Sequence, residues 1–128
     1  MSDERSAHER GLATLMAIAG PRSSETLGDW SEIAPDMERY IVDFVAGDVL
    51  SRPGLDAKTR QLLTVAALTA LATAPTELKM HLGGALRLGW TQTEIVEAII
   101  QMAVFAGFPA TLGALAIAKE VFAGPGAA

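Results

Sequence analysis

Cysteine is absent from all 128 residues of the chain, which excludes disulfide bonds, thiolate metal sites and thiol catalysis. The absence does not indicate a compartment, because a protein without disulfides can occur anywhere. Aromatic residues are also few, at 5%, although half of all residues are hydrophobic. Alanine and leucine supply much of that half, a composition that favours closely packed helices.

Positive charge is scarce as well. Ten Lys and Arg residues stand against fifteen Asp and Glu residues, and the net charge is −5. The basic residues are scattered and form no stripe, so a nucleic-acid partner is not expected. The N-terminus, MSDERSAHERG, lacks the basic start and apolar run of a secretory signal, and we therefore predict a cytoplasmic location.

One uncharged run, residues 98–118, is long enough to cross a bilayer on length alone. Gly107 and Pro109 interrupt it near the middle, and Gln101 and Thr111 lower its apolarity. These residues predict two helices joined by a tight turn. We therefore expect no contact with a membrane.

Turn signals cut the chain into pieces of helical length, and no stretch alternates with a period of two residues. The predicted fold is all-α, a single domain over residues 1–128 with five to six helices. The helices are expected near residues 8–19, 35–50, 57–71, 75–88, 92–106 and 109–122. Residues 22–35 are expected to form an irregular loop anchored by Trp30.

Two of these helices carry distinctive apolar patterns. The helix from Pro35 has one broad apolar stripe, which consists of Met37, Tyr40, Ile41, Phe44, Val45 and Val49. The next helix is apolar on nearly every face beyond Gln61, which predicts burial in the centre of the molecule or between subunits. So much apolar surface in a small chain also predicts a homo-oligomer.

The candidate chemistry lies in the stretch TELKMHLGGALRLG, residues 76–89. Glu77 and His81 are four residues apart and so share one face of a helix. From this spacing His81 is either a structural histidine that Glu77 holds in place, or an acid–base group that Glu77 makes more basic. The adjacent Gly83-Gly84 pair, costly in a helix, indicates a close approach by another backbone or by a ligand.

The sequence gives little support for a metal site, a serine nucleophile or a phosphate-binding loop. A metal site would need a third ligand beside Glu77 and His81, and the one other histidine, His8, stands near the N-terminus. No serine lies in a G-x-S-x-G context, and the glycines of residues 83–89 lack the strand that precedes a phosphate-binding loop.

Three motifs in order resemble gamma-carboxymuconolactone decarboxylase and its relatives, which share the all-helical fold of the AhpD-type peroxidases. They read SRPGLDAKTRQLLTVAALTAL, then TELKMHLGGALRLGWTQTEIVEAIIQMAVFAGFPA, then AIAKEVF. The ERGLATLMAIAG start is similar too, so the resemblance covers nearly the whole chain. It implies an AhpD-like helical fold and a homo-oligomer, a trimer or hexamer.

The peroxidase branch of that superfamily uses a C-x-x-C followed by a histidine. His81 matches the histidine, whereas Ala74 and Glu77 stand at the two cysteine positions. Peroxide reduction through a disulfide is therefore excluded. The decarboxylase branch has this Glu and His, so the resemblance assigns catalysis to His81 and Glu77.

The resemblance implies a decarboxylase of a small carboxylated lactone that needs no metal and no organic cofactor. Electrons released with carbon dioxide collect as a dienolate, which His81 protonates while Glu77 orients the ring. Arg10 and Arg52, with Arg60 behind them, are the candidates that hold a substrate carboxylate. For each arginine, a surface or capping charge is the alternative.

The chain departs from the decarboxylase pattern where polar or aromatic groups are expected. Ala46 and Leu50 replace tryptophans, Phe105 replaces a tyrosine, and Leu112 or Gly113 replaces an asparagine. A less polar pocket suggests a related but more apolar substrate. Two other functions therefore stay open: a non-enzymatic or regulatory protein that binds a small acid, and an isomerase or hydrolase that uses the same Glu and His.

Overall fold

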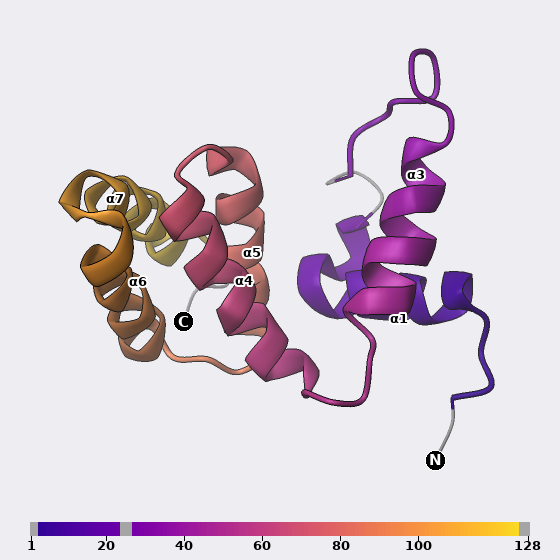
Figure 1. Cartoon of the computed structure of the whole chain (residues 1–128), viewed down its shortest axis with the longest axis horizontal. Coiled ribbons are helices and arrows are strands. Elements are labelled where there is room, and N and C mark those ends of the chain that lie inside the picture. The colour runs from indigo at the N-terminus through magenta and orange to yellow at the C-terminus, as the bar shows by residue number, and fades with distance from the viewer. Residues whose placement is uncertain (1–2, 24–26, 126–128) are drawn as a thin grey trace. The chain divides into compact units, whose positions relative to one another are not determined.

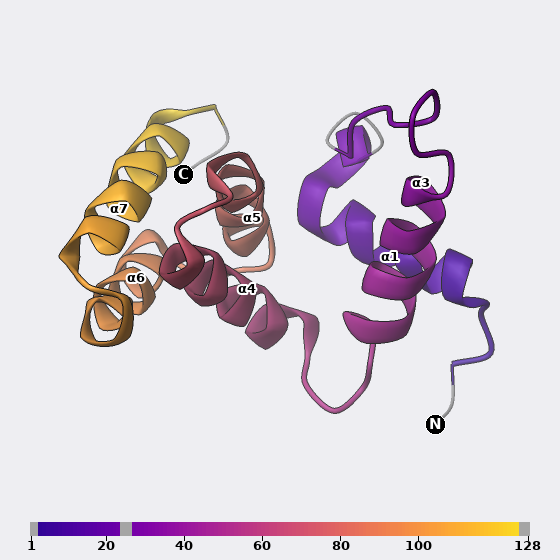
Figure 2. The ribbon, with the colours of Figure 1, turned by 45° about the horizontal axis from the view of Figure 1, so that its top comes forward.

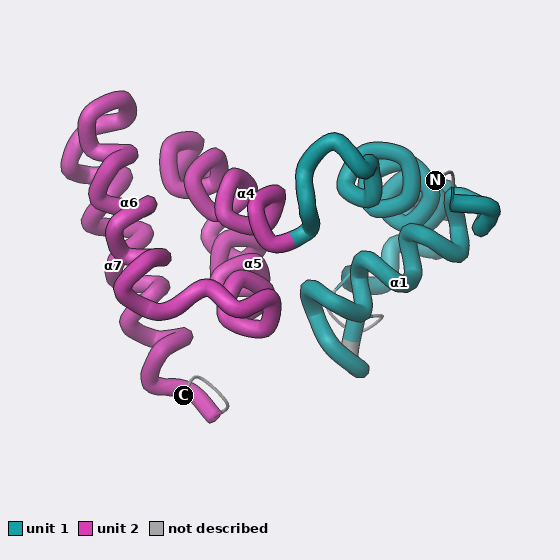
Figure 3. The backbone as a smooth tube through the Cα atoms, turned by 90° about the horizontal axis from the view of Figure 1, so that it is seen from below, with its two compact units in different colours: residues 1–57 teal, residues 58–128 magenta. Residues whose placement is uncertain are grey.

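A computed structural model describes residues 3–23 and 27–125, and within these ranges the chain is all-helical and has no strand. It divides into two compact units, unit 1 with residues 1–57 and unit 2 with residues 58–128 (Figures 1 and 3). This confirms the all-α prediction. The expectation of a single domain stays a prediction.

Unit 1 is built on two long helical segments. The first, α1 (Ala7–Ala19), begins where the Ser6 hydroxyl accepts a hydrogen bond from the amide of Glu9, and ends at Gly20 with φ at 72°. A short 3-10 turn, η1 (Gly20–Arg22), follows. The second segment starts as α3 (Met37–Arg39) and continues as η2 (Tyr40–Val49), which has π-type winding. The bond from the amide of Leu50 to the carbonyl of Val45 is one of its five-residue links.

The backbones of α1 and η2 touch at two glycines. A Cβ on Gly11 would collide with the carbonyl oxygen of Val42, and a Cβ on Gly47 would collide with that of Ala7. Around this approach Leu15, Val42 and Ala46 form a small core. The contact therefore requires glycine at both positions, and few buried side chains surround it.

The apolar stripe on the helix from Pro35 is mostly exposed within this chain, at Met37, Tyr40, Phe44, Val45 and Val49. The residues of η2 that pack toward α1 are Val42, Ala46 and Gly47. Trp30, the expected anchor of the loop, is half exposed, and its Nε1 donates to the carbonyl of Leu27. Residues 24–26 of the predicted loop lie outside the described residues.

Unit 2 contains four helices with sharply defined ends. They are α4 (Ala57–Leu71), α5 (Pro75–Arg87), α6 (Gln92–Ala106) and α7 (Phe108–Ala123). The predicted capping box is present: Thr91 and Glu94 each accept a hydrogen bond from the other's backbone amide. Pro75 opens α5, and Gly107, with φ at 88°, ends α6 as expected. In Figures 1 and 2, α5 lies beside α4 and α6 beside α7.

The core of unit 2 is larger than that of unit 1 and draws on all four helices. Its buried members are Val65, Leu78, Leu82, Ala85, Ile95, Ile99, Ala114 and Ala118. Within this single chain Leu63 and Leu71 of α4 are more than half exposed, so burial of these residues between subunits stays a prediction. Only the face with Gln61, Val65 and Thr69 is buried.

The uncharged run at residues 98–118 forms the end of α6 and the start of α7, as predicted. None of the helices that the structure describes combines the length and apolarity needed to cross a membrane. The turn between α6 and α7 nevertheless exposes much apolar surface. Val104 and Phe105 are 78% and 77% exposed, and Phe108 and Leu112 are also mostly exposed.

Candidate functional site

Glu77 and His81 lie one turn apart on α5, as their spacing predicts. His81 is half-buried, whereas Glu77 is exposed near the start of the helix. Within the described part of the chain, no hydrogen bond is found between the two side chains. Glu77 acts on the ring through its charge, which raises the pKa of His81. Burial has the larger effect and holds the pKa of His81 below its usual value.

The nearest partner of the His81 ring is Gln61, on the buried face of α4. Its amide nitrogen lies 2.9 Å from Nδ1 of His81 and 2.8 Å from the main-chain carbonyl oxygen of the same residue. Gln61 is only 2% exposed. The structure therefore places a buried amide, and not the predicted carboxylate, against the imidazole.

Sequence reasoning did not select Gln61 as a functional residue. The residue stands at the polar start of an otherwise apolar helix, where a glutamine commonly faces solvent. One signal was available in the sequence: Gln61, Val65 and Thr69 follow one another at intervals of four and so share a helix face. Because Val65 is apolar, that face belongs to the core, and a glutamine on it needs a polar partner.

The second histidine, His8, has a different environment. It lies on α1 with its side chain more than half exposed, and its Nδ1 is 2.7 Å from a carboxylate oxygen of Asp43. A carboxylate at neutral pH only accepts hydrogen bonds, so Nδ1 of His8 is the donor. This pair is a surface ion-pair contact of a kind that adds little to stability.

Gly83 leaves free space on α5, in contrast to Gly11 and Gly47 of unit 1. A Cβ at Gly83 would meet only the end of the Arg87 side chain, at 3.4 Å. Among the described residues, no backbone outside α5 lies within 4 Å of that Cβ position, although the neighbouring Gly84 is buried. The close approach that the sequence predicted for the pair is thus not made at Gly83 by another helix of this chain.

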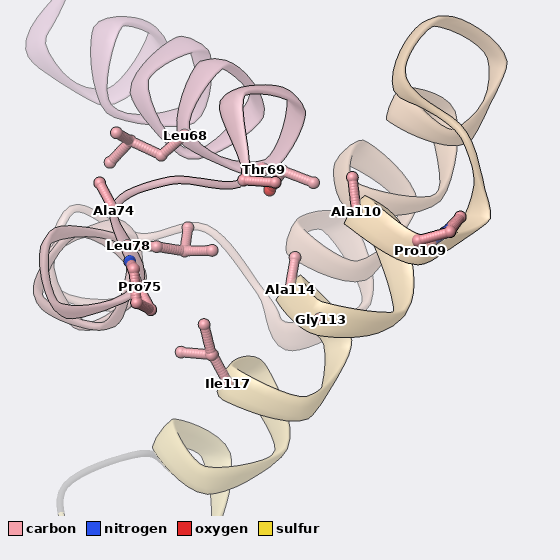
Figure 4. Close-up of a pocket in the computed structure, with 11 residues that line it drawn as sticks. Leu68, Thr69, Ala74, Pro75, Leu78, Pro109, Ala110, Gly113, Ala114 and Ile117 are labelled. Atoms are coloured by element: carbon pink, nitrogen blue, oxygen red, sulfur yellow. The ribbon is translucent and has the colours of Figure 1, made fainter.

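An apolar pocket of about 190 Å³ opens between α4, α5 and α7 (Figure 4). Leu68 and Thr69 line it from α4, Leu78 from α5, and Ala114 and Ile117 from α7. Ala74, which stands at a cysteine position of the peroxidases, lines it too. His81 is not among the lining residues, so the pocket and the candidate acid–base group are separate features of unit 2.

The predicted arginines differ in their surroundings. Arg10 belongs to unit 1, where its guanidinium donates to the carbonyls of Gly47 and Arg5 and lies 3.5 Å from a carboxylate oxygen of Asp48. Arg52 is exposed in the same unit. Arg60 is half-buried on α4 in unit 2, the unit that holds Glu77 and His81.

The structure also places the positions that depart from the decarboxylase pattern. Ala46 is fully buried in the core of unit 1, so its small size is explained by packing against α1. Phe105 and Leu112 are mostly exposed on the turn between α6 and α7, and Gly113 lines the apolar pocket.

Comparison with known proteins supports the resemblance of the sequence. The sequence model of the carboxymuconolactone decarboxylase family matches residues 35–120. A 4-carboxymuconolactone decarboxylase from Acinetobacter baylyi is 38% identical over 126 residues, which cover 95% of this chain and 90% of that protein.

Two further relatives match shorter stretches. An uncharacterized 15.0 kDa protein of Paracoccus denitrificans, encoded between nqo9 and nqo10, is 42% identical over 72% of this chain and 69% of its own length. The nitrosuccinic acid decarboxylase of Metarhizium robertsii is 36% identical over 65% of this chain and 57% of its own length.

Proposed function

The chain belongs to the carboxymuconolactone decarboxylase family and is a carboxy-lyase, and we propose that its substrate is a small carboxylated lactone or a related acid. The observation that carries the proposal is the near full-length similarity to a 4-carboxymuconolactone decarboxylase. The buried face around His81 supports it with a group suited to moving a proton.

The names of two relatives indicate what such substrates have in common. Carboxymuconolactone carries its carboxylate on a carbon conjugated with the lactone carbonyl, and nitrosuccinic acid carries one next to a nitro group. In each compound the electron pair left by carbon dioxide moves onto oxygen, as a dienolate or as a nitronate. We therefore expect this chain to require an oxygen-bearing electron acceptor conjugated with the carbon that loses its carboxylate.

Catalysis then needs a hydrogen-bond donor at the oxygen where charge develops and a proton for the carbon. We propose that the Nε2–H group of His81 donates to that oxygen, and that the proton taken up by the carbon is passed on by His81 and replaced from solvent. Because its Nδ1 is occupied by Gln61, only Nε2 is available for the substrate. Glu77 is proposed to assist through its charge, which acts on the same ring. No metal and no organic cofactor takes part in the proposed reaction.

Arg10 and Arg52 are the proposed contacts for a substrate carboxylate. Arg10 also donates to two main-chain carbonyls of unit 1, and Arg52 is exposed in the same unit. An arginine that binds the substrate equally in ground and transition states changes KM and leaves kcat unchanged. We expect Arg52→Ala to raise KM for a dicarboxylic substrate by roughly tenfold or more.

The proposal is tested with purified protein and three compounds: gamma-carboxymuconolactone, nitrosuccinate, and a saturated lactone carboxylate that lacks the conjugated acceptor. Release of carbon dioxide is measured for each. We expect turnover of at least one of the first two and none of the third. Turnover of the saturated compound, or retention of all three unchanged, would contradict the proposal.

We also propose that the protein works as a homo-oligomer, a trimer or hexamer. The support is the apolar surface that this chain leaves exposed on the turn between α6 and α7, at Val104, Phe105, Phe108 and Leu112. Sedimentation at micromolar concentration tests this, and a monomer would contradict it. Phe105→Glu is expected to lower the oligomeric state, with Glu97→Gln on the same helix as the control.

A further inference from the structure

The environment of His81 fixes the orientation of the Gln61 amide. A main-chain carbonyl oxygen can only accept a hydrogen bond. The Gln61 atom 2.8 Å from the carbonyl oxygen of His81 is therefore the amide nitrogen, because the amide oxygen there would face a second acceptor. The same nitrogen lies 2.9 Å from Nδ1 of the ring.

This geometry has a consequence for the ring. The amide nitrogen carries two hydrogens, and its two neighbours each take one. Nδ1 must then present a lone pair, which places the ring proton on Nε2. A proton on Nδ1 would point at the amide hydrogen, so both the other tautomer and the imidazolium ion are disfavoured.

Packing holds Gln61 in this position. It is 2% exposed and lies on the buried face of α4, one turn before Val65, which belongs to the core of unit 2. The two hydrogen bonds reach both the side chain and the backbone of one residue. Glu77, by contrast, is exposed and influences His81 only through its charge.

We propose that Gln61 is a positioning residue, which holds His81 as a neutral imidazole with its proton on Nε2. A hydrogen bond into Nδ1 also draws electron density from the ring, which makes the Nε2–H group a stronger donor. Such a donor suits a site that must stabilise a developing oxyanion. The catalytic part of this inference rests on the proposed function, whereas the tautomer does not.

The tautomer can be read from ¹⁵N NMR of the imidazoles in the unmodified protein near pH 7.5. The chain has two histidines, and a His8→Asn variant assigns their signals. We expect His81 to be neutral with its proton on Nε2. His8 is the internal reference, because its Nδ1 donates to Asp43. A proton on Nδ1 of His81, or a charged ring, would overturn the inference.

Two variants test whether Gln61 is the cause. Gln61→Met keeps the volume and removes the donor, so we expect both neutral tautomers of His81 to appear. With a reactive substrate, kcat should fall roughly tenfold or more and KM should change less than twofold. Gln61→Glu supplies an acceptor and should shift the ring proton to Nδ1. Gln101→Met, at an exposed glutamine of α6, is the matched control.

The outcomes separate this inference from the proposed function. If the variants are folded by circular dichroism and the His81 signals and kcat are unchanged, Gln61 has no positioning role even though the enzyme decarboxylates. If no substrate reacts but the tautomer responds to Gln61 as described, the positioning of His81 stands and the proposed function fails.

Discussion

The two histidines show how differently the two units treat the same side chain. In unit 1, His8 is exposed and its Nδ1 donates to the carboxylate of Asp43. In unit 2, His81 is half-buried and its Nδ1 accepts from the buried amide of Gln61. The carboxylate accepts a hydrogen from the ring of His8, whereas the amide donates one to the ring of His81. The partner at Nδ1, more than the spacing of residues along a helix, therefore decides what each histidine can do.

The helix contacts of the two units differ in a similar way. Unit 1 brings two backbones together at Gly11 and Gly47, with a core of few side chains. Unit 2 packs four helices through a larger set of aliphatic side chains. Unit 1 is therefore sensitive to an added atom at Gly11 or Gly47, and unit 2 is sensitive to loss of volume from its core.

The largest effect is expected from replacing His81, and the same substitution at His8 is the comparison. His81→Ala should lower turnover of a reactive substrate by roughly 10²–10⁴-fold, because it removes the group proposed to donate to the developing oxyanion and to pass the proton to carbon. His8→Ala should change kcat and KM by less than about twofold. Helical circular dichroism shows that both variants are folded. Equal losses of activity from the two substitutions would break the contrast between the histidines.

The glycines give the next contrast. Gly47→Ala should destabilise unit 1 by about 3 kcal/mol, because the new Cβ collides with the carbonyl of Ala7 and the helices must move apart. Gly83→Ala should raise stability by up to about 1 kcal/mol, since alanine favours a helix and its Cβ would meet only the end of Arg87. Urea unfolding of the two variants measures both values. A tolerated Gly47→Ala would contradict the backbone contact between α1 and η2.

The smallest effect is a pH dependence of stability that arises from His81. Burial lowers its pKa in the folded state below the ordinary value of 6.5, so below that pH the unfolded chain binds more protons. The contribution of His81 to the free energy of unfolding should therefore be constant above pH 6.5, and the free energy should fall as the pH drops below 6.5. Urea midpoints between pH 8 and pH 5 measure the change. The free energy of unfolding should fall less in His81→Asn than in the unmodified protein. If it falls equally in both, groups other than His81 cause the pH dependence.

Sequence alone predicted the elements of unit 2 closely. The helix at residues 92–106 has the expected bounds because Thr91, Glu94 and Gly107 are local signals that act within one turn. Pro75 opens α5 for a similar reason. Such signals depend on neighbours in the chain and need no knowledge of the tertiary fold.

The features that sequence did not predict depend on partners distant in the chain. The broad apolar stripe from Pro35 onward lies mostly exposed within this chain, whereas Val42 and Ala46, which the stripe does not include, are buried against α1. Glu77 was chosen as the partner of His81 because it is near in sequence. Gln61, twenty residues away, is the partner in space. Which tautomer His81 adopts follows only from that packing.

The π-type winding of η2 also affects how sequences of the family should be aligned. Val42 and Gly47 are five residues apart, yet both face α1. In a homologue with an ordinary α-helix here, each turn would contain fewer residues, so two residues on the same face would be closer together in the sequence. A one-residue gap within residues 40–49 would then mark equivalent geometry, and an ungapped alignment would pair buried positions of this chain with exposed positions of the homologue.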